Sequence, residues 1–343
     1  MRSASINETA RIRAGFIVGP TAVGKTLVAI RVAEQLGAEI VNADSRQLYR
    51  GMDIGTAKPR ADELRRAPHH LIDIRDPDAP LDVAEFTAAA RAAIVEIARR
   101  GRPVLVVGGS GLYLRAIRGG LFSGPPASSE IRARLAGLAR QHGVGPLFER
   151  LREIDPAAAA WIKPNDLKRI VRVLEVYELT GTRMSEHQRR HHFAERPFET
   201  LTVGLTLPRE RLYQTIDQRF EAMVAEGLVN EVRMLLAKGY DRMHPKPLTC
   251  TSVDDHWAPA ALPLDTIGYR EIAAFLRGEM DLAEAVARAK RASRRLAKRQ
   301  LTWFRADPEI VWLDSARAAD QALKLFQKFF SAQVANVPFT LPP

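Results

Sequence analysis

Cysteine is almost absent from this chain, since Cys250 is the only one in 343 residues. A single thiol excludes an internal disulfide framework and any zinc or iron–sulfur site built on several thiolates, and it is typical of a reducing compartment. No apolar run is long enough to span a bilayer, and the first fourteen residues contain no apolar signal-peptide core. We therefore expect a cytoplasmic protein with no membrane association.

Acidic residues are also in deficit. The chain has 40 Asp and Glu against 51 Lys and Arg, which gives a net charge of +11. A well-solvated basic surface would explain this balance, and so would a polyanionic partner such as nucleic acid. Charge alone does not choose between them. The hydrophobic content of 46% is ordinary for a globular protein, and the length allows two domains or one domain with a large insertion.

Strand and helix patterns alternate in two parts of the chain. Short apolar runs predict strands at 15–19, 38–45, 102–108, 201–207 and 310–313, and helical spacing predicts helices at 26–36, 82–100, 209–238 and 281–305. This alternation indicates a parallel α/β sheet. Between 123 and 196 the patterns are helical, with no strand among them.

The predicted fold is therefore an α/β, P-loop NTPase-like parallel sheet core with a helical insertion domain. The core comprises residues 15–122 and 197–330, and the insertion comprises 123–196. Residues 1–14 are expected to form a ragged N-terminus, 331–343 a frayed tail, and 241–264 an irregular surface loop.

A phosphate-binding loop follows the first predicted strand. It matches GxxxxGK[ST] in full through Gly19, Pro20, Thr21, Ala22, Val23, Gly24, Lys25 and Thr26, and it opens a helix. In such a loop the backbone N–H groups and the helix N-terminus face a diphosphate, the Lys adds a full charge, and the Thr hydroxyl can ligate Mg²⁺. ATPases, kinases and diphosphate transferases all use this loop, so it does not identify the reaction.

Asp44 follows the second predicted strand. Because the carboxyl ends of parallel strands line the ligand crevice, we expect Asp44 to lie near the P-loop. The residue could cap the next helix, bind magnesium or act as a general base, and the local sequence leaves these three open.

Several longer blocks are more specific. GPTAVGKT, NADSRQLYRGMDIGTAKP, PHHLID, VGGSGLYLRAI, NDLKRIVRVLEV, IGYREI and SRRLAKRQLTWFR occur in this order between residue 15 and about residue 305. Together they resemble the bacterial tRNA dimethylallyltransferases, also called tRNA isopentenyltransferases. The resemblance implies transfer of a dimethylallyl group from dimethylallyl diphosphate to the exocyclic amine of the adenosine 3′ to the anticodon. The tRNAs would be those that read codons beginning with U, and diphosphate would be released.

The resemblance also implies roles for individual residues. Lys25, Thr26 and Mg²⁺ would neutralise the leaving diphosphate, and Arg219 would contact it, although an arginine on an amphipathic helix is otherwise typical of a solvated face. Asp44 would be the general base. Ser110 stands where the family usually has Thr, so it keeps the hydroxyl and loses a methyl group.

The predicted tRNA contacts come from the same resemblance and from a run of basic residues. Residues 288–305 contain eight Lys and Arg and no acid, which favours contact with a phosphate backbone. The expected contacts are Asp44, Ser45, Arg46, Gln47, Ser110, Lys168, Arg169, Ile170, Val171, Arg172, Gly268, Tyr269, Arg270, Arg294, Arg295, Lys298 and Arg299. Ile170 and Val171 could also face inward on an amphipathic helix.

Histidines give weaker signals. His187, His191 and His192 have a spacing that could suggest a metal site, but no cysteine or carboxylate cluster accompanies them, so a basic solvated or RNA-facing helix is favoured. His69 and His70 belong to the PHHLID block and receive no role.

Three other functions compete with tRNA prenylation. They are a P-loop kinase or ATPase, an adenylate isopentenyltransferase acting on free AMP, and a non-catalytic RNA-binding module. The insertion and the basic run argue against the first two, since a small substrate needs no such surface. The expected protein is a monomer that binds a tRNA anticodon stem-loop.

Overall fold

The computed structural model describes residues 11–79, 81–122, 124–191, 195–240 and 263–331. Cys250, His192, residues 241–262 of the expected loop, residues 1–10 of the expected N-terminus and residues 332–343 of the expected tail lie outside these residues. Within them no helix combines the length and the apolar character that crossing a membrane requires.

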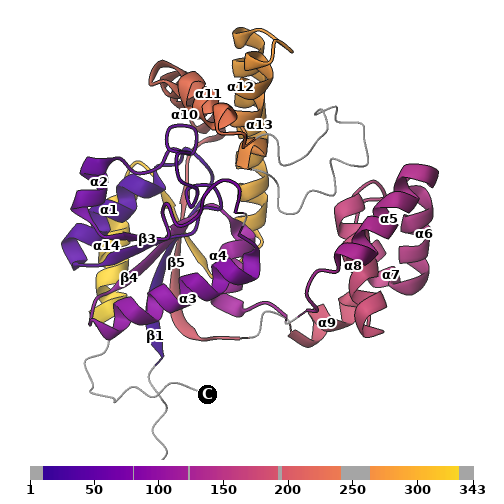
Figure 1. The fold of residues 1–343 in the computed structure, drawn as a ribbon. Coiled ribbons are helices and arrows are strands. Elements are labelled where there is room, and N and C mark those ends of the chain that lie inside the picture. Colours follow the sequence, from indigo (N-terminus) through magenta and orange to yellow (C-terminus); the bar gives the residue numbers. More distant parts are fainter. Residues whose placement is uncertain (1–10, 80, 123, 192–194, 241–262, 332–343) are drawn as a thin grey trace, which may run out of the picture.

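A six-stranded sheet, parallel throughout, forms the centre of the molecule (Figure 1). Its order is β3-β2-β4-β1-β5-β6. The strands are β1 (Ile12–Val18), β2 (Glu39–Asn42), β3 (His69–His70), β4 (Val104–Gly108), β5 (Phe198–Thr206) and β6 (Ile310–Asp314). β1 lies between β4 and β5, so the loop after β1 is at the topological switch point, where the strand order reverses. Ligands usually bind at this point in such folds.

Helices cover both faces of the sheet because successive side chains of a strand point to opposite sides. In β1, Phe16 faces one core with α3 (Val83–Arg99) and α4 (Gly111–Gly119), whereas Ile17 faces another with α1 (Lys25–Leu36) and α14 (Ala318–Ser331). The remaining core helices are α2 (Ala61–Arg66), α10 (Arg209–Ala225), α11 (Leu228–Ala237), α12 (Tyr269–Leu276) and α13 (Leu282–Arg305), with a short 3₁₀ turn at Pro263–Asp265.

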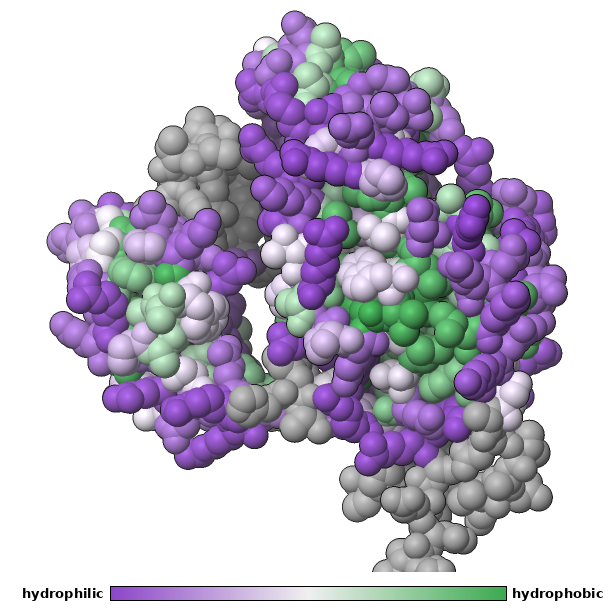
Figure 2. Space-filling model, turned by 180° about the vertical axis from the view of Figure 1, so that it is seen from behind, coloured by the Kyte–Doolittle hydropathy of each residue, from purple (hydrophilic) through white to green (hydrophobic). Residues whose placement is uncertain are grey.

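The insertion is a bundle beside the core, with a hydrophobic cluster of its own (Figures 1 and 2). It contains α5 (Ser129–His142), α6 (Gly145–Ile154), α7 (Pro156–Ala159), α8 (Leu167–Thr180) and α9 (Met184–His191). Its one fully buried glutamate, among the described residues, is Glu175, which accepts hydrogen bonds from Arg132, Arg172 and the Ser128 backbone N–H. These bonds hold its pKa below the usual value against the opposing effect of burial.

Two predicted boundaries were wrong. The first strand begins at Ile12, inside the expected ragged terminus, because Arg13 bonds to Glu199 at 2.9 Å and to the Phe329 carbonyl at 2.7 Å. The single helix expected at 209–238 is two helices, because Gly227 adopts a φ of 109°, a left-handed value that ends α10 and starts α11.

Candidate active site

Three chain segments meet at the carboxyl edge of the sheet. The P-loop follows β1, Asp44 follows β2 and Ser110 follows β4. The register brings them together, since Val18 pairs with Gly108 and Asn42 pairs with Val107. The sequence-based expectation that Asp44 lies near the P-loop is therefore consistent with the topology of the sheet.

The P-loop needs glycine at both ends. Gly19 has a φ of 148° and a Cβ there would lie 2.8 Å from the Leu205 carbonyl oxygen, while Gly24 has a φ of 91°. α1 begins at Lys25, so its N-terminal N–H groups face the loop, and Lys25 Nζ donates to the Pro20 carbonyl at 2.8 Å. The loop thus presents backbone donors and one ammonium to an anion.

Two partly buried cations stand beside one carboxylate. Burial lowers the pKa of Lys25 from 10.5 to about 8; Asp44 opposes this shift and Arg219 reinforces it. Burial also lowers the pKa of Arg219, again against the effect of Asp44. Because like charges in a poorly hydrated site repel, an anion placed between Lys25 and Arg219 would relieve an unfavourable arrangement.

A chain of hydrogen bonds joins Arg219 to Gly109, the residue before Ser110. Arg219 Nη2 donates to Thr21 Oγ1 at 2.6 Å, and the Thr21 backbone N–H donates to Gln300 Oε1 at 2.8 Å. Gln300 Nε2 in turn donates to the Gly109 carbonyl at 3.0 Å. The sequence reasoning identified Arg219 but missed Gln300. The one available signal was an uncharged amide at the end of the basic AKRQ run.

Asp44 is held by its own turn. Its Oδ1 accepts the Arg46 backbone N–H at 2.8 Å, and its N–H donates to Asn42 Oδ1 at 3.2 Å. Residues 45–48 form turns rather than a helix, so the helix-cap alternative is excluded. Within the described chain Oδ2 accepts no hydrogen bond, which leaves one carboxylate oxygen available to a ligand.

Ser110 lies in the same wall as Asp44. Gly108 makes this possible, because a Cβ there would collide with the Ala43 carbonyl. Ser110 Oγ accepts the Ser45 backbone N–H at 3.2 Å and can still donate its own proton. Serine therefore keeps one hydroxyl contact that a threonine at this position would supply.

These residues enclose a cavity of about 700 Å³, a size that suits a drug-sized ligand. Its charged and polar wall includes Thr21, Asp44, Ser45, Arg46, Ser110, Arg219, Arg270, Arg299 and Gln300, and its apolar wall includes Ile216, Phe220 and Met223. A second cavity of about 770 Å³ shares Gly111, Arg299 and Trp303 with the first.

Some predicted base-binding residues have other contacts. Gln47 Nε2 donates to the carbonyls of Thr56 and Ala57 at 3.1 and 3.0 Å. Its amide is therefore bonded to the backbone of the 56–57 segment instead of facing the cavity. The prediction that Tyr269 contacts tRNA is wrong for its side chain, which is fully buried and donates its hydroxyl to Glu231 at 2.5 Å. Gly268 does not line the cavity, whereas its neighbour Arg270 does.

The basic residues of α13 divide into paired and unpaired groups. Arg294 Nε lies 2.9 Å from Asp217, and this bidentate pair raises the arginine's pKa. For Arg295, Lys298 and Arg299, the described part of the chain supplies no ion pair, and all three are exposed. The unpaired three are therefore better suited to bind a polyanion than Arg294 is.

The KRIVR block of the insertion is also divided. Ile170 and Val171 are fully buried in the bundle core, so the prediction that their side chains contact tRNA is wrong. Lys168 and Arg169 are exposed at the start of α8, and Arg172 is bonded to Glu175 at 2.7 Å. The amphipathic pattern of α8 produces this division.

The histidines have structural partners. His70 Nε2 lies 2.7 Å from Glu39, and His69 Nδ1 lies 2.7 Å from the Ala67 carbonyl, at the edge strand β3. His187 stacks on Phe122, and His191 lies 3.2 Å from Glu195. Across the described ranges, no three His, Cys, Asp or Glu side chains gather to hold a metal ion.

Comparison with known proteins identifies the family. Residues 47–307 match the family model described as IPP transferase. The chain is 48% identical to tRNA dimethylallyltransferase 2 of Syntrophus aciditrophicus over 87% of this chain and 90% of that one. It is 45% identical to the tRNA dimethylallyltransferase of Geobacter metallireducens over 95% and 100% of the two chains.

Solved structures agree with these matches. The full-length tRNA isopentenylpyrophosphate transferase of Bacillus halodurans is 38% identical, with a TM-score of 0.65 over 94% of this chain and 96% of that one. A eukaryotic dimethylallyltransferase acting on tRNA is 26% identical, with a TM-score of 0.76 over 94% and 80%. On its sequence and its fold, this chain belongs to the IPP transferase family.

Proposed function

We propose that this protein transfers a dimethylallyl group from dimethylallyl diphosphate to the exocyclic N6 of an adenosine next to a tRNA anticodon. The observation that carries the proposal is the cavity in which an anion site and a carboxylate face each other. Arg219 and Asp44 both line this cavity, and Lys25 of the P-loop interacts electrostatically with both of them. The relatives from Syntrophus aciditrophicus and Geobacter metallireducens are tRNA dimethylallyltransferases.

The diphosphate of the donor would bind at the P-loop. Lys25, Arg219 and the N-terminus of α1 offer positive charge there, and charge-assisted bonds to phosphate are the strong ones. The apolar stripe of Ile216, Phe220 and Met223 lies on the same helix as Arg219 and lines the same cavity. A five-carbon chain attached to the bound diphosphate would find an apolar wall beside it.

Magnesium fits this site as a partner of the diphosphate. Thr26 follows the P-loop lysine on the first turn of α1, and Mg²⁺ in such sites takes one or two protein oxygens together with phosphate oxygens. A metal held in this way would neutralise charge on the leaving diphosphate. The lack of a multi-residue ligand cluster in the described ranges is compatible with such a site.

The transfer itself would use Asp44. As the adenine N6 forms a bond to C1 of the dimethylallyl group, the bond from C1 to the diphosphate oxygen breaks and the diphosphate leaves with the electron pair. One N6 proton passes to the free carboxylate oxygen of Asp44. The bond between Arg46 N–H and Oδ1 keeps the other oxygen oriented toward the cavity. The Ser110 hydroxyl, which belongs to the wall of the same cavity, would help orient the base.

The RNA would approach across the exposed cations. Arg295, Lys298 and Arg299 on α13 and Lys168 and Arg169 on the insertion are exposed, and of these Arg169 is paired with Asp166. The target adenosine must turn out of the loop, which costs a few kcal/mol and less in a single strand than in a duplex. The second cavity, which shares Trp303 with the first, would receive neighbouring parts of the RNA loop. We expect one protein chain to bind one anticodon stem-loop.

The experiment is mass spectrometry of tRNA hydrolysates after incubation with dimethylallyl diphosphate and Mg²⁺. The expected product is N6-dimethylallyladenosine, and Asp44→Ala should slow its formation about 10²–10⁴-fold while tRNA binding is kept. Asp62→Asn, an exposed acid on α2, is the matched control and should be silent. ATP turnover without tRNA prenylation would favour a kinase or ATPase, and equal use of AMP would favour an adenylate transferase.

A further inference from the structure

Glu231 on α11 collects four hydrogen bonds from two distant segments. Its Oε2 accepts the backbone N–H groups of Asp53 and Ile54 at 3.0 and 2.8 Å. Its Oε1 accepts the Gly55 N–H at 3.1 Å and the Tyr269 hydroxyl at 2.5 Å. Three successive N–H donors on one carboxylate hold the turn at 53–55 through charge-assisted hydrogen bonds.

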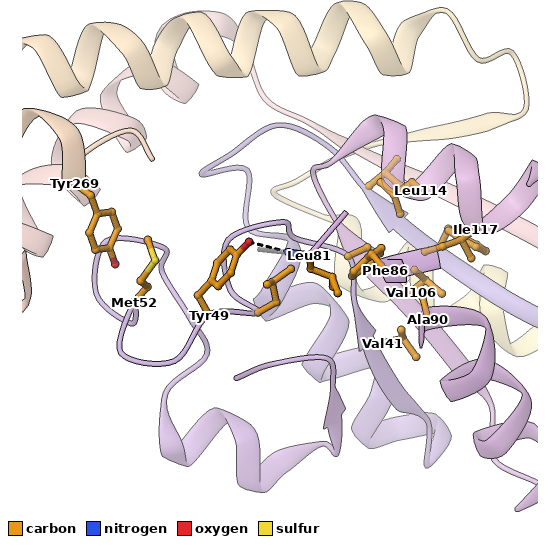
Figure 3. Close-up of a cluster of buried hydrophobic side chains, with 14 of the residues drawn as sticks. Val41, Tyr49, Met52, Leu81, Phe86, Ala90, Val106, Leu114, Ile117 and Tyr269 are labelled. Atoms are coloured by element: carbon orange, nitrogen blue, oxygen red, sulfur yellow. Dashed lines mark hydrogen bonds between the residues drawn. The ribbon is translucent and has the colours of Figure 1, made fainter. Parts of the chain in front are cut away.

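The Tyr269 ring closes the other side of this turn. A Cβ on Gly55 would collide with the ring, so the turn and the ring are in direct contact. Tyr269 is fully buried, and Figure 3 shows its side chain pointing toward the loop that carries Met52. Burial and the neighbouring Glu231 carboxylate raise its pKa well above the usual value, so the phenol remains a donor to Glu231.

The turn at 53–55 that Glu231 holds is continuous with the wall of the cavity. Gly55 and Thr56 line the cavity that contains Asp44. The carbonyls of Thr56 and Ala57 accept the side-chain amide of Gln47, three residues beyond Asp44. Any shift of the 53–57 turn is therefore transmitted through Gln47 to the turn that orients Asp44.

We propose that Glu231 and Tyr269 form a positioning pair that sets the adenine-facing wall of the cavity, and this inference rests on the proposed prenyl transfer. Glu231 touches no substrate and acts through the 53–57 turn. The hydrogen bonds of the pair go to the 53–55 turn and not to Lys25 or Arg219, so its removal should disturb the acceptor and leave the P-loop contacts of the donor in place. It also gives the buried Tyr269 a role other than the RNA contact expected from the sequence.

The test is single-turnover prenylation of an anticodon stem-loop by the full-length protein. With enzyme in saturating excess the single-turnover rate constant does not depend on the fraction of active enzyme, so partial unfolding does not imitate the effect. Glu231→Ala removes all four bonds and should lower the rate constant about 10²-fold, the size expected from a misplacement of about 1 Å. Tyr269→Phe removes one bond, keeps the ring against Gly55, and should lower it no more than about tenfold.

Two further readouts separate positioning from general damage. The Kd for dimethylallyl diphosphate should stay within about twofold of wild type in every variant, because the P-loop side is untouched. In Glu231→Gln the amide oxygen can still accept two of the backbone N–H groups, while the NH2 group takes the position of the other oxygen, so its rate constant should lie between those of Glu231→Ala and wild type. Glu226→Gln, whose exposed side chain pairs with Arg60, is the matched control and should be silent.

The outcomes are distinguishable. If wild type prenylates the stem-loop and Glu231→Ala matches its single-turnover rate, the positioning pair is refuted while the function stands. If the donor Kd rises in parallel with the loss of rate, the residue supports the whole fold and the positioning role is also refuted. If wild type forms no product on tRNA, the failure belongs to the proposed function.

Discussion

The protonation of Lys25 should make donor binding depend on pH. In the free protein burial lowers its pKa from 10.5 to about 8, so the ammonium loses its proton near pH 8. A bound diphosphate favours the charged form and raises this pKa, and by reciprocity the protonated enzyme binds the donor more tightly. Donor affinity should therefore be nearly constant around pH 7 and fall progressively above pH 8.

The magnitude follows from the fraction of protonated Lys25. With a pKa of about 8, only about 3% of the free protein carries the ammonium at pH 9.5, so the Kd should rise about 30-fold between pH 7 and pH 9.5. The donor contributes little to this change because phosphate groups complete their ionisation near pH 6. Calorimetric titration with dimethylallyl diphosphate, without tRNA, measures the effect.

A second measurement checks the sign of the same shift. Because Lys25 holds its proton less tightly when folded than when unfolded, the unfolded chain binds more protons between pH 8 and 10.5, and stability rises with pH across that window. This contribution is on the order of 3 kcal/mol in total. Denaturant unfolding should show this rise in stability up to pH 9.5. At higher pH Tyr113 opposes the rise, because its pKa is raised to about 12 in the folded protein.

The decisive variant is Lys25→Met. It should bind the donor weakly at every pH. Neither the increase of Kd with pH nor the increase of stability with pH should remain. If Lys25→Met keeps the wild-type slope, another group titrates and the ammonium does not contact the diphosphate. That result would refute the electrostatic role of Lys25 in the P-loop.

Three other substitutions test separate parts of the site. Arg219→Met should lower kcat/KM for the donor about 10–100-fold, since a charged hydrogen bond is lost, and the exposed Arg211→Met on the same helix should not. Arg299→Ala should reduce the dependence of stem-loop binding on salt by about 0.7 log unit per tenfold salt, whereas Arg294→Ala should reduce it less, because Asp217 already neutralises that arginine. Gln300→Glu keeps the acceptor for the Thr21 N–H but loses the donor to the Gly109 carbonyl. A single-turnover rate equal to that of wild type would show that the hydrogen-bonded link between the P-loop and Gly109 is dispensable.

The local patterns of the sequence predicted most of the fold. Continuous apolar runs marked the buried strands, and the glycine-rich loop between a strand and a helix marked the anion site. The order of the strands could not be predicted in this way, because it depends on which runs pair across the sheet and not on the runs themselves. The break at Gly227 was missed because the apolar pattern continues across it on both sides.

Residue types near the site were predicted more reliably than their orientations. KRIVR and GYR are basic or aromatic blocks, and such blocks suit RNA, yet Ile170, Val171 and Tyr269 are buried. Helical periodicity indicates which side of a helix is apolar, but it does not say which partner covers that side. Tyr269 is buried because its ring packs in the core cluster and against Gly55, and its hydroxyl has Glu231 as a partner.

The sequence by itself determined the phosphate-binding loop, the parallel α/β core, the helical insertion and the family resemblance, because each depends on spacing along the chain. Tertiary structure alone decided that Gln300 bridges the P-loop to Gly109, that Asp217 neutralises Arg294, and that Glu231 clamps the turn beside the cavity. These contacts join residues more than 75 positions apart. No local pattern records such a pairing, since it arises only when the packed helices bring the two side chains within hydrogen-bond distance.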